Sequence, residues 1–277
     1  MIDAHLHFWR VGRNDFAWPT PDLAEIHRDF LPEHFAPLAD AAGVTGALLV
    51  QSQQSDRDTA WLIELARDTP IVRGVVGWAD LLAADAPDQI AALAAQPKFR
   101  GLRPMLQGLA DDYWIAKPRL EPALDAMVAH DLSLDALVLT RHLDALLAVA
   151  ERRPNLSIVI DHCAKPPIAD QAFDDWATKI SRLAACPRVT CKISGLLTEA
   201  APGQPDDAIL RYVEHVVARF GADRLMWGSD WPVLNLASDY GRWIALARRL
   251  CGFREPEALA AFFADTARRV YRLDAPT

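Results

Sequence analysis

Two histidines separated by one residue, His5 and His7, lie in the apolar segment that begins the chain. Side chains alternate between the two faces of a β-strand, so residues two apart point the same way. Two imidazoles on one face can bind a divalent ion, a carbonyl group or a water molecule. We therefore interpret the pair as active-site residues at the end of a first strand; an accidental pair in a core strand is the alternative.

A third histidine follows an apolar, β-branched segment and comes shortly before two prolines. Ile-Val-Ile leads into Asp161 and His162, and Pro166 and Pro167 turn the chain. This order places His162 at the rim of a sheet, where we expect a role in the site, although it could simply bond to a loop. Asp161 faces the opposite way and could anchor the fold or orient a ligand from behind.

A carboxylate ends the last strand-like segment. Asp230 follows Gly228, which lets the backbone approach closely, and precedes a Trp-Pro pair. Such an aspartate suits a general base or a metal ligand, and a helix N-cap is the alternative. Arg103 ends another segment and keeps its charge, so it could hold a carboxylate, polarise a carbonyl oxygen, or pair with a carboxylate of the fold.

Other polar and aromatic residues are expected around the same opening. The predicted substrate contacts are Gln51, Ser52, Trp78, Trp114 and Trp231. Asp135 and Lys192 could line the pocket or pack in the core. Cys163 and Cys191 are interpreted as small buried hydrophobes rather than nucleophiles.

Eight apolar, β-rich segments have the length of strands and must position these residues. They are Ile2–His7, Val44–Gln51, Ile71–Trp78, Phe99–Pro104, Leu132–Val138, Leu156–Asp161, Arg188–Ser194 and Arg224–Ser229. Segments of helical periodicity alternate with them: Pro32–Ala42, Asp58–Asp68, Pro87–Ala95, Leu120–His130, Arg141–Arg153, Ala172–Ala185, Asp206–Phe220 and Asp239–Leu250. This alternation predicts a parallel sheet, and eight repeats favour a closed (β/α)8 barrel as a single domain over residues 1–277.

The (β/α)8 barrel prediction places the site. Working groups of such barrels lie at the carboxyl ends of the strands. The irregular segment Gly12–Leu31 is long enough to cover that opening. No glycine-rich phosphate-binding motif of an open sheet is present in the sequence.

Composition excludes several classes of protein. The formal charge of −8 argues against nucleic acid or an anionic membrane as a partner, and 51% hydrophobic residues suffice for a large core. The four cysteines show no CxxC spacing, and no secretory or membrane-spanning segment is evident, so we expect reduced thiols in a cytoplasmic enzyme. A monomer and a homodimer are both compatible with the sequence.

The whole set of segments resembles the amidohydrolase superfamily, and within it the amidohydrolase-2 branch of sugar-acid lactonases, such as those acting on fucono- and rhamnono-lactones. The similar segments are IDAHLHFW, RDFLPEHFAPLADAAGV, FRGLRP, VIDHCAKPPI, CKISGL and RLMWGSDWPV, with YRL near Tyr271. The resemblance implies a (β/α)8 barrel that hydrolyses an aldonolactone.

The resemblance stops short of the two-metal members of the superfamily, which carry a carboxylated lysine on strand four and a histidine on strand five. Here those strands offer Arg103 and Asp135. It therefore implies at most one divalent ion, zinc by preference, held by some of His5, His7, His162 and Asp230. A metal-independent reaction is the alternative, because a lactone is an activated ester.

The expected reaction is hydrolysis by water that Asp230 deprotonates, with His162 holding the carbonyl or the water. One ion, or Arg103 with the histidine pair, would stabilise the oxyanion. Two rivals stay open: a metal-dependent decarboxylase or hydrolase of an aromatic or dicarboxylic acid, resembling 2-pyrone-4,6-dicarboxylate lactonases, and a non-catalytic sugar-acid binder.

Overall fold

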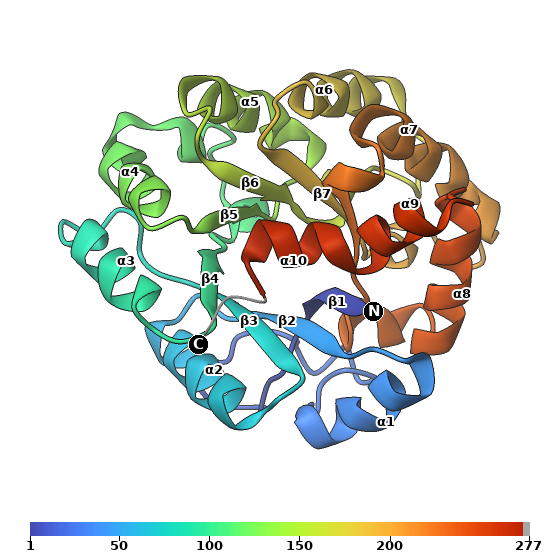
Figure 1. Ribbon diagram of the computed structural model, residues 1–277, viewed down its shortest axis with the longest axis horizontal. Helices are drawn as coiled ribbons and strands as arrows, with labels where there is room; N and C mark the ends of the chain where they lie inside the picture. The colour runs from blue at the N-terminus through green and yellow to red at the C-terminus, as the bar shows by residue number, and fades with distance from the viewer. Residues whose placement is uncertain (274–277) are drawn as a thin grey trace.

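Figure 1 shows the computed structural model of the protein, which describes residues 1–273. Eight parallel strands follow one another in sequence order around a single sheet. They are β1 (Ile2–Leu6), β2 (Gly46–Val50), β3 (Val72–Gly77), β4 (Phe99–Leu102), β5 (Ser133–Ala136), β6 (Ser157–Ile160), β7 (Val189–Ile193) and β8 (Leu225–Trp227). The predicted (β/α)8 barrel is confirmed.

Backbone hydrogen bonds between the ends of β1 and β8 bring the first and last strands together. The amide of His7 donates to the carbonyl of Trp231 at 2.8 Å, and the amide of Asp230 donates to the carbonyl of His5, also at 2.8 Å. A Cβ on Gly228 would lie 2.8 Å from Cβ of His5. Glycine is therefore required here, and these contacts place Asp230 beside the histidine pair.

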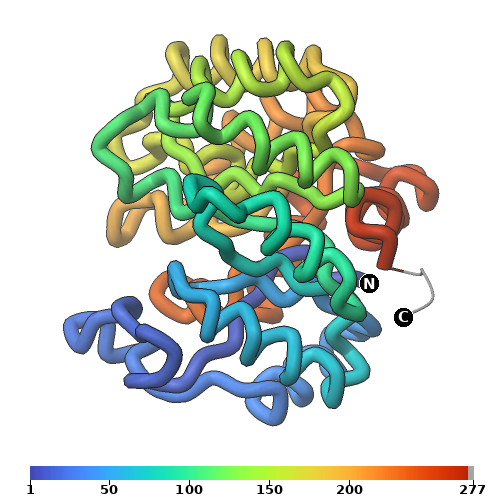
Figure 2. Tube along the Cα trace, turned by 90° about the vertical axis from the view of Figure 1, so that its left-hand side faces the viewer, coloured from blue at the N-terminus to red at the C-terminus, as the bar shows by residue number. Residues whose placement is uncertain are grey.

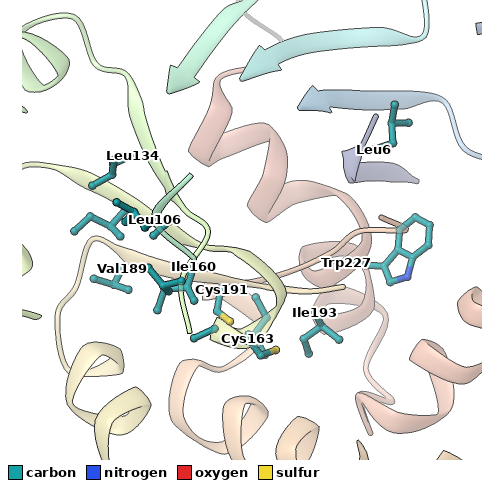
Figure 3. Packing of buried hydrophobic residues seen from close by; sticks show 14 of the residues in the cluster. Leu6, Leu106, Leu134, Ile160, Cys163, Val189, Cys191, Ile193 and Trp227 are labelled. Atoms are coloured by element: carbon teal, nitrogen blue, oxygen red, sulfur yellow. The ribbon is translucent and has the colours of Figure 1, made fainter. Parts of the chain in front are cut away.

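Eight helices surround the sheet, close to the predicted ranges. They are α1 (Pro32–Ala42), α2 (Asp56–Asp68), α3 (Ala86–Ala94), α4 (Glu121–Ala129), α5 (Leu143–Arg152), α6 (Asp174–Ala184), α7 (Leu210–Phe220) and α8 (Tyr240–Leu250). Each buries one apolar face against the outside of the strands. Figure 3 shows part of this layer, where Ile160, Cys191 and Ile193 pack, and where Cys163 is buried as expected.

A C-terminal segment that the periodicity did not reveal covers the amino ends of the strands. It comprises α9 (Pro256–Ala260), a π-helical turn (Ala261–Asp265) and α10 (Thr266–Tyr271). In Figure 1 α10 crosses the middle of the barrel, and in Figure 2 it lies on the same side as the N-terminus. Ala267 and Tyr271 pack against apolar side chains inside the barrel, among them Ile2, Val159 and Met226.

The opposite end of the barrel carries the long segment 10–31 after β1, dark blue in Figure 2. Gln53 fixes it after β2: its Oε1 accepts from the amide of Ala17 at 2.9 Å, and its Nε2 donates to the carbonyl of Trp18 at 2.6 Å. The segment therefore borders the opening, as its length suggested. Among the residues that the structure describes, no helix is long and apolar enough to cross a membrane.

Candidate functional site

Four side chains from three strand ends converge at the opening of the barrel. Nε2 of His5 lies 3.2 Å from Nε2 of His7. Oδ1 of Asp230 lies 3.2 Å from Nε2 of His7, 3.6 Å from Nε2 of His5 and 3.9 Å from Nε2 of His162. All four side chains are almost fully buried. The structure thus brings together the four residues that the sequence analysis named as possible ligands of one ion.

The hydrogen bonds of His7 show that something positive belongs in this cluster. Its Nδ1 lies 2.8 Å from the carbonyl oxygen of Val50, which can only accept, so the proton is on Nδ1. In the neutral ring Nε2 is then an acceptor, yet it faces the carboxylate of Asp230 at 3.2 Å. Two acceptors in contact require a shared proton or a cation between them.

The backbone holds Asp230 in a conformation that points it inward. Its φ of 59° lies in the left-handed region, which aspartate tolerates better than most residues. Beneath it, the carboxylate of Asp3 accepts from the amides of Ser229 at 2.8 Å and His5 at 3.2 Å, and from the hydroxyl of Tyr240 at 2.9 Å. Asp3 therefore ties the carboxyl end of β8 to β1.

His162 lies in a left-handed turn of four residues, which alternation along a strand could not predict. The φ angles of His162, Cys163, Ala164 and Lys165 are 52°, 52°, 62° and 46°. The carbonyl of His162 accepts from the amide of Lys165 at 2.8 Å, and Nδ1 of His162 lies 2.8 Å from Oγ of Ser194. The turn thus directs His162 into the cluster and Lys165 toward the cavity.

Glycine at position 195 makes room for the His162 ring. Its φ is +61°, and a Cβ there would lie 2.6 Å from Nδ1 of His162. Ring and backbone therefore touch, and any side chain would displace the imidazole from the cluster.

Charged groups lie next to both ring nitrogens of His5. Nδ1 of His5 lies 3.2 Å from Oδ1 of Asp161 and 3.3 Å from Nζ of Lys192. Arg103 places Nη1 3.4 Å from Nε2 of His5 and 3.5 Å from Oδ2 of Asp161. Asp161 therefore lies behind His5, outside the residues that line the cavity.

Burial sets the protonation of these groups. It lowers the pKa of His5 well below its usual range, and it lowers the pKa of His162. Burial alone would raise the pKa of Asp230, but His162, the His7 bond and His5 hold that pKa below its usual range. The imidazoles of His5 and His162 are therefore neutral, and the carboxylate of Asp230 is ionised.

This donor set fits one divalent ion. Zinc takes histidine nitrogens and carboxylate oxygens at about 2.0–2.2 Å, which puts neighbouring donors of a tetrahedral site roughly 3.3–3.6 Å apart. The separations of 3.2 Å and 3.6 Å among His5, His7 and Asp230 are of this size. His5, His7 and Asp230 satisfy the geometry of a three-ligand group, and His162 stands beside them.

A cavity of about 130 Å³ opens above the donors. It is lined by His7, Trp18, Ser52, Arg103, Met105, Gln107, Leu137, His162, Lys165, Asp230 and Val233. The polar side chains in this lining can donate hydrogen bonds to the hydroxyl groups of a ligand or accept hydrogen bonds from them. Its volume is below the range of about 300–1,000 Å³ typical for drug-sized ligands, so it suits a single small ring.

Four residues predicted to touch substrate do not line this cavity. Gln51 is buried and donates from Nε2 to the carbonyl of Arg103 at 2.8 Å. Trp231 packs among Phe8, Phe30 and Phe35 behind β1. Trp231 follows Asp230 directly, and with Asp230 pointing into the barrel its side chain lies in the outer layer.

The other two tryptophans lie outside the barrel opening. Trp78 lines a groove between α2 and α3, and its amide and carbonyl both bond to the hydroxyl of Thr59. Trp114 lies in a short helical turn, Trp114–Ala116, that packs against α5. These two tryptophans anchor the surrounding helices.

Six cavity residues were not predicted from the sequence: Trp18, Met105, Gln107, Leu137, Lys165 and Val233. Trp18 is held by Gln53, a contact across 35 positions that no local pattern reveals. Lys165 had a signal, since it stands three residues after His162 in the same turn. Its Nζ pairs with Oε1 of Glu199 at 2.5 Å.

Comparison with known proteins agrees with this geometry. The amidohydrolase family profile matches residues 2–273. The chain, over its full length, is 53% identical to an L-fucono-1,5-lactonase of Burkholderia ambifaria, 97% of which it covers. An L-fucono-1,5-lactonase of Burkholderia multivorans is 35% identical, over 99% of this chain and 97% of its own. The crystal structure of an amidohydrolase from Burkholderia multivorans with bound zinc superposes with a TM-score of 0.92 at 34% identity, covering 98% of each chain. This chain belongs to the amidohydrolase family.

Proposed function

We propose that this protein is a lactonase that hydrolyses a six-membered sugar-acid lactone of the L-fucono-1,5-lactone type to the open acid. The observation that carries the proposal is the cluster of three imidazoles on the ionised carboxylate of Asp230, at the floor of a small polar cavity. Its 53% identity to an L-fucono-1,5-lactonase points to the substrate.

In the proposed mechanism Asp230 is the general base. Its carboxylate takes a proton from a water molecule as the water attacks the lactone carbonyl carbon. The ring C–O bond then breaks, and Asp230 returns the proton to the departing alkoxide. The low pKa of Asp230 keeps the carboxylate ionised and ready between turnovers.

Arg103 and His162 would act on the carbonyl side of the lactone. The guanidinium of Arg103 lines the cavity next to His5 and can bond to the oxygen on which negative charge develops. His162 borders the same cavity and orients the lactone or the water. Ser52, Gln107 and Lys165 are placed to bond to ring hydroxyls, and Trp18 to cover an apolar face of the ring.

We further propose that His5, His7 and Asp230, with His162 as a further donor, hold one zinc ion. The acceptor-to-acceptor contact between His7 and Asp230 supports a cation there. A bound zinc ion supplies Lewis-acid polarisation of the carbonyl oxygen.

The rival reading, an aromatic-acid decarboxylase, needs a largely apolar pocket. The cavity instead presents Ser52, Gln107 and Lys165 together with the donor cluster. This lining favours a hydroxylated ring.

The test is a pH-indicator assay over a panel of aldonolactones, with L-fucono-1,5-lactone and its 1,4 isomer as the decisive pair. We expect acid release to be fastest with the 1,5-lactone. Absence of acid release from every lactone, despite binding seen by calorimetry, would establish a non-catalytic binder instead.

A further inference from the structure

Three ionisable residues lie inside the barrel beneath the donor cluster, and the proposed reaction uses none of them. They are Asp135 on β5, Lys192 on β7 and Tyr271 on α10. Each is fully buried. They lie between the C-terminal helix at one end of the barrel and His5 at the other.

Short distances connect them into one continuous chain. The hydroxyl of Tyr271 donates to Oδ2 of Asp135 at 2.6 Å, and Nζ of Lys192 donates to the same oxygen at 2.7 Å. Nζ of Lys192 is also 3.0 Å from Oδ1 of Asp161. That oxygen lies 3.2 Å from Nδ1 of His5, the ring nitrogen that faces away from the cavity.

Lys192 is held from two further directions. Oδ1 of Asp135 accepts from the hydroxyl of Ser133 at 2.8 Å, which fixes the carboxylate that receives the ammonium. The ammonium also lies 5.3 Å from the centre of the Tyr271 ring, within the range of a cation–π contact. Lys192 therefore has one well-defined position between two carboxylates.

Fold stability alone does not account for this arrangement. Removing charges from water is costly, and apolar side chains of similar volume often stabilise a fold as well as a buried ion pair does.

The position of Asp161 matters because of what it faces. A metal-binding histidine usually donates its second ring N–H to a carboxylate or carbonyl, which fixes the tautomer and the ring orientation. Val50 supplies that acceptor to His7. Asp161 occupies the corresponding place for His5, with Oδ1 3.2 Å from Nδ1, and Nζ of Lys192 lies 3.3 Å from the same nitrogen. A proton shared between Nδ1 and Asp161 would leave the Nε2 lone pair directed into the cluster.

We propose that Lys192 is a positioning residue which, supported by Asp135 and by Tyr271 of the C-terminal helix, holds Asp161 against His5 and so aims His5 Nε2 at the bound zinc ion. The inference rests on the proposed zinc site. It gives the C-terminal helix a role in the active site, although that helix covers the opposite end of the barrel.

The test measures zinc affinity directly, by competition with a chromogenic chelator, together with kcat and KM. Lys192→Met should weaken zinc binding about 10–100-fold, the range found when outer partners of metal ligands are removed. It should lower kcat with little change in KM, because Lys192 does not line the cavity. Tyr271→Phe removes a single hydroxyl and should shift both quantities in the same direction by a smaller factor.

Val159→Ala is the matched control. Val159 lies inside the barrel in the same apolar cluster as Tyr271 and lacks a polar group, so its truncation lowers stability without touching the charged chain. Zinc affinity and kcat should stay at wild-type values in this variant. If Lys192→Met does not fold, Tyr271→Phe against Val159→Ala carries the comparison.

Two negative outcomes are distinguishable. Wild-type protein that binds no zinc would remove both the proposed metal site and this inference. If wild-type protein binds zinc and both Tyr271→Phe and Lys192→Met bind it with the wild-type affinity, this inference alone is overturned. The proposed lactonase activity would be unaffected.

Discussion

Nε2 of His7 and Oδ1 of Asp230 lie 3.2 Å apart, although the carbonyl of Val50 already accepts the proton on the other ring nitrogen of His7. Neither atom can donate to the other while the imidazole is neutral. The same carboxylate oxygen lies 3.6 Å from Nε2 of His5. A divalent cation resolves all of these contacts at once, which is why the metal and the base must be tested separately.

Asp230→Asn, with its zinc content checked by elemental analysis, tests the base. Asparagine has nearly the same shape but cannot accept the proton of water, so kcat should fall about 10²–10⁴-fold while the melting temperature changes little. Steady-state acid release from the 1,5-lactone measures kcat. Asp239→Asn is the matched control, since Asp239 caps α8 outside the cavity and asparagine also caps well. Near-wild-type turnover in Asp230→Asn would show that Asp230 is not the general base.

Metal removal tests the zinc site. Dialysis against a chelator should lower the rate, and added zinc should restore it, because the carbonyl loses a Lewis acid that Arg103 alone replaces only in part. Elemental analysis before and after dialysis verifies the removal. Ser52→Ala, which alters the cavity lining without a metal donor, should lose and regain activity in the same way as wild type. Full activity in protein verified to be metal-free would establish metal-independent hydrolysis.

Much of this architecture could be predicted because parallel strands are buried on both faces and read as continuous apolar segments. All five residues of β2 are buried, for example. The polar residues at the ends of β1, β4, β6 and β8 then had to meet at one opening, and His7, Arg103, His162 and Asp230 do line one cavity.

The sequence did not predict which way side chains point after the end of a strand. The left-handed backbone at Asp230 and at His162 interrupts the alternation of side chains, so the direction of the residues that follow cannot be read from the strand pattern. Contacts across the whole chain were equally out of reach: Tyr271 meets Asp135 over 136 positions, and only the folded barrel brings them together.

Trp18→Ala tests the proposed wall of the sugar site. Loss of the aromatic face should raise KM about tenfold, equivalent to about 1.4 kcal/mol of binding, with a smaller change in kcat. Gln53→Ala should act in the same direction, because Gln53 holds the backbone around Trp18 at 2.6 Å and 2.9 Å. Trp114→Phe, away from the cavity, is the control. An unchanged KM in Trp18→Ala would place the sugar elsewhere in the cavity.

Asp58 should make stability depend on pH. Burial raises the pKa of Asp58 to about 6, and the side chain is 2% exposed. Because the folded-state pKa lies above the unfolded value of about 3.9, the contribution of this group is fully present below pH ~4 and is lost as the pH rises through ~6. The loss amounts to at most about 3 kcal/mol.

Asp58→Asn removes this titration. The free energy of unfolding of the variant relative to wild type should therefore rise by up to about 3 kcal/mol between pH ~4 and ~7, as measured by urea unfolding. Asp56→Asn, at an exposed position in the same helical turn, serves as the reference. A difference that does not change over this pH range would contradict the raised pKa of Asp58.

The left-handed turn at His162 should show its strain in a glycine substitution. Left-handed backbone costs a non-glycine residue about 1–2 kcal/mol, and Ala164 adopts it with a φ of 62°. In Ala164→Gly, relief of that strain offsets the lost methyl group and the added freedom of the unfolded chain, so stability should stay nearly unchanged. Ala136→Gly, at an equally buried position of β5, has no strain to relieve and should lose about 1–2 kcal/mol. Equal losses in the two variants, measured by urea unfolding, would mean that the turn carrying His162 is not strained.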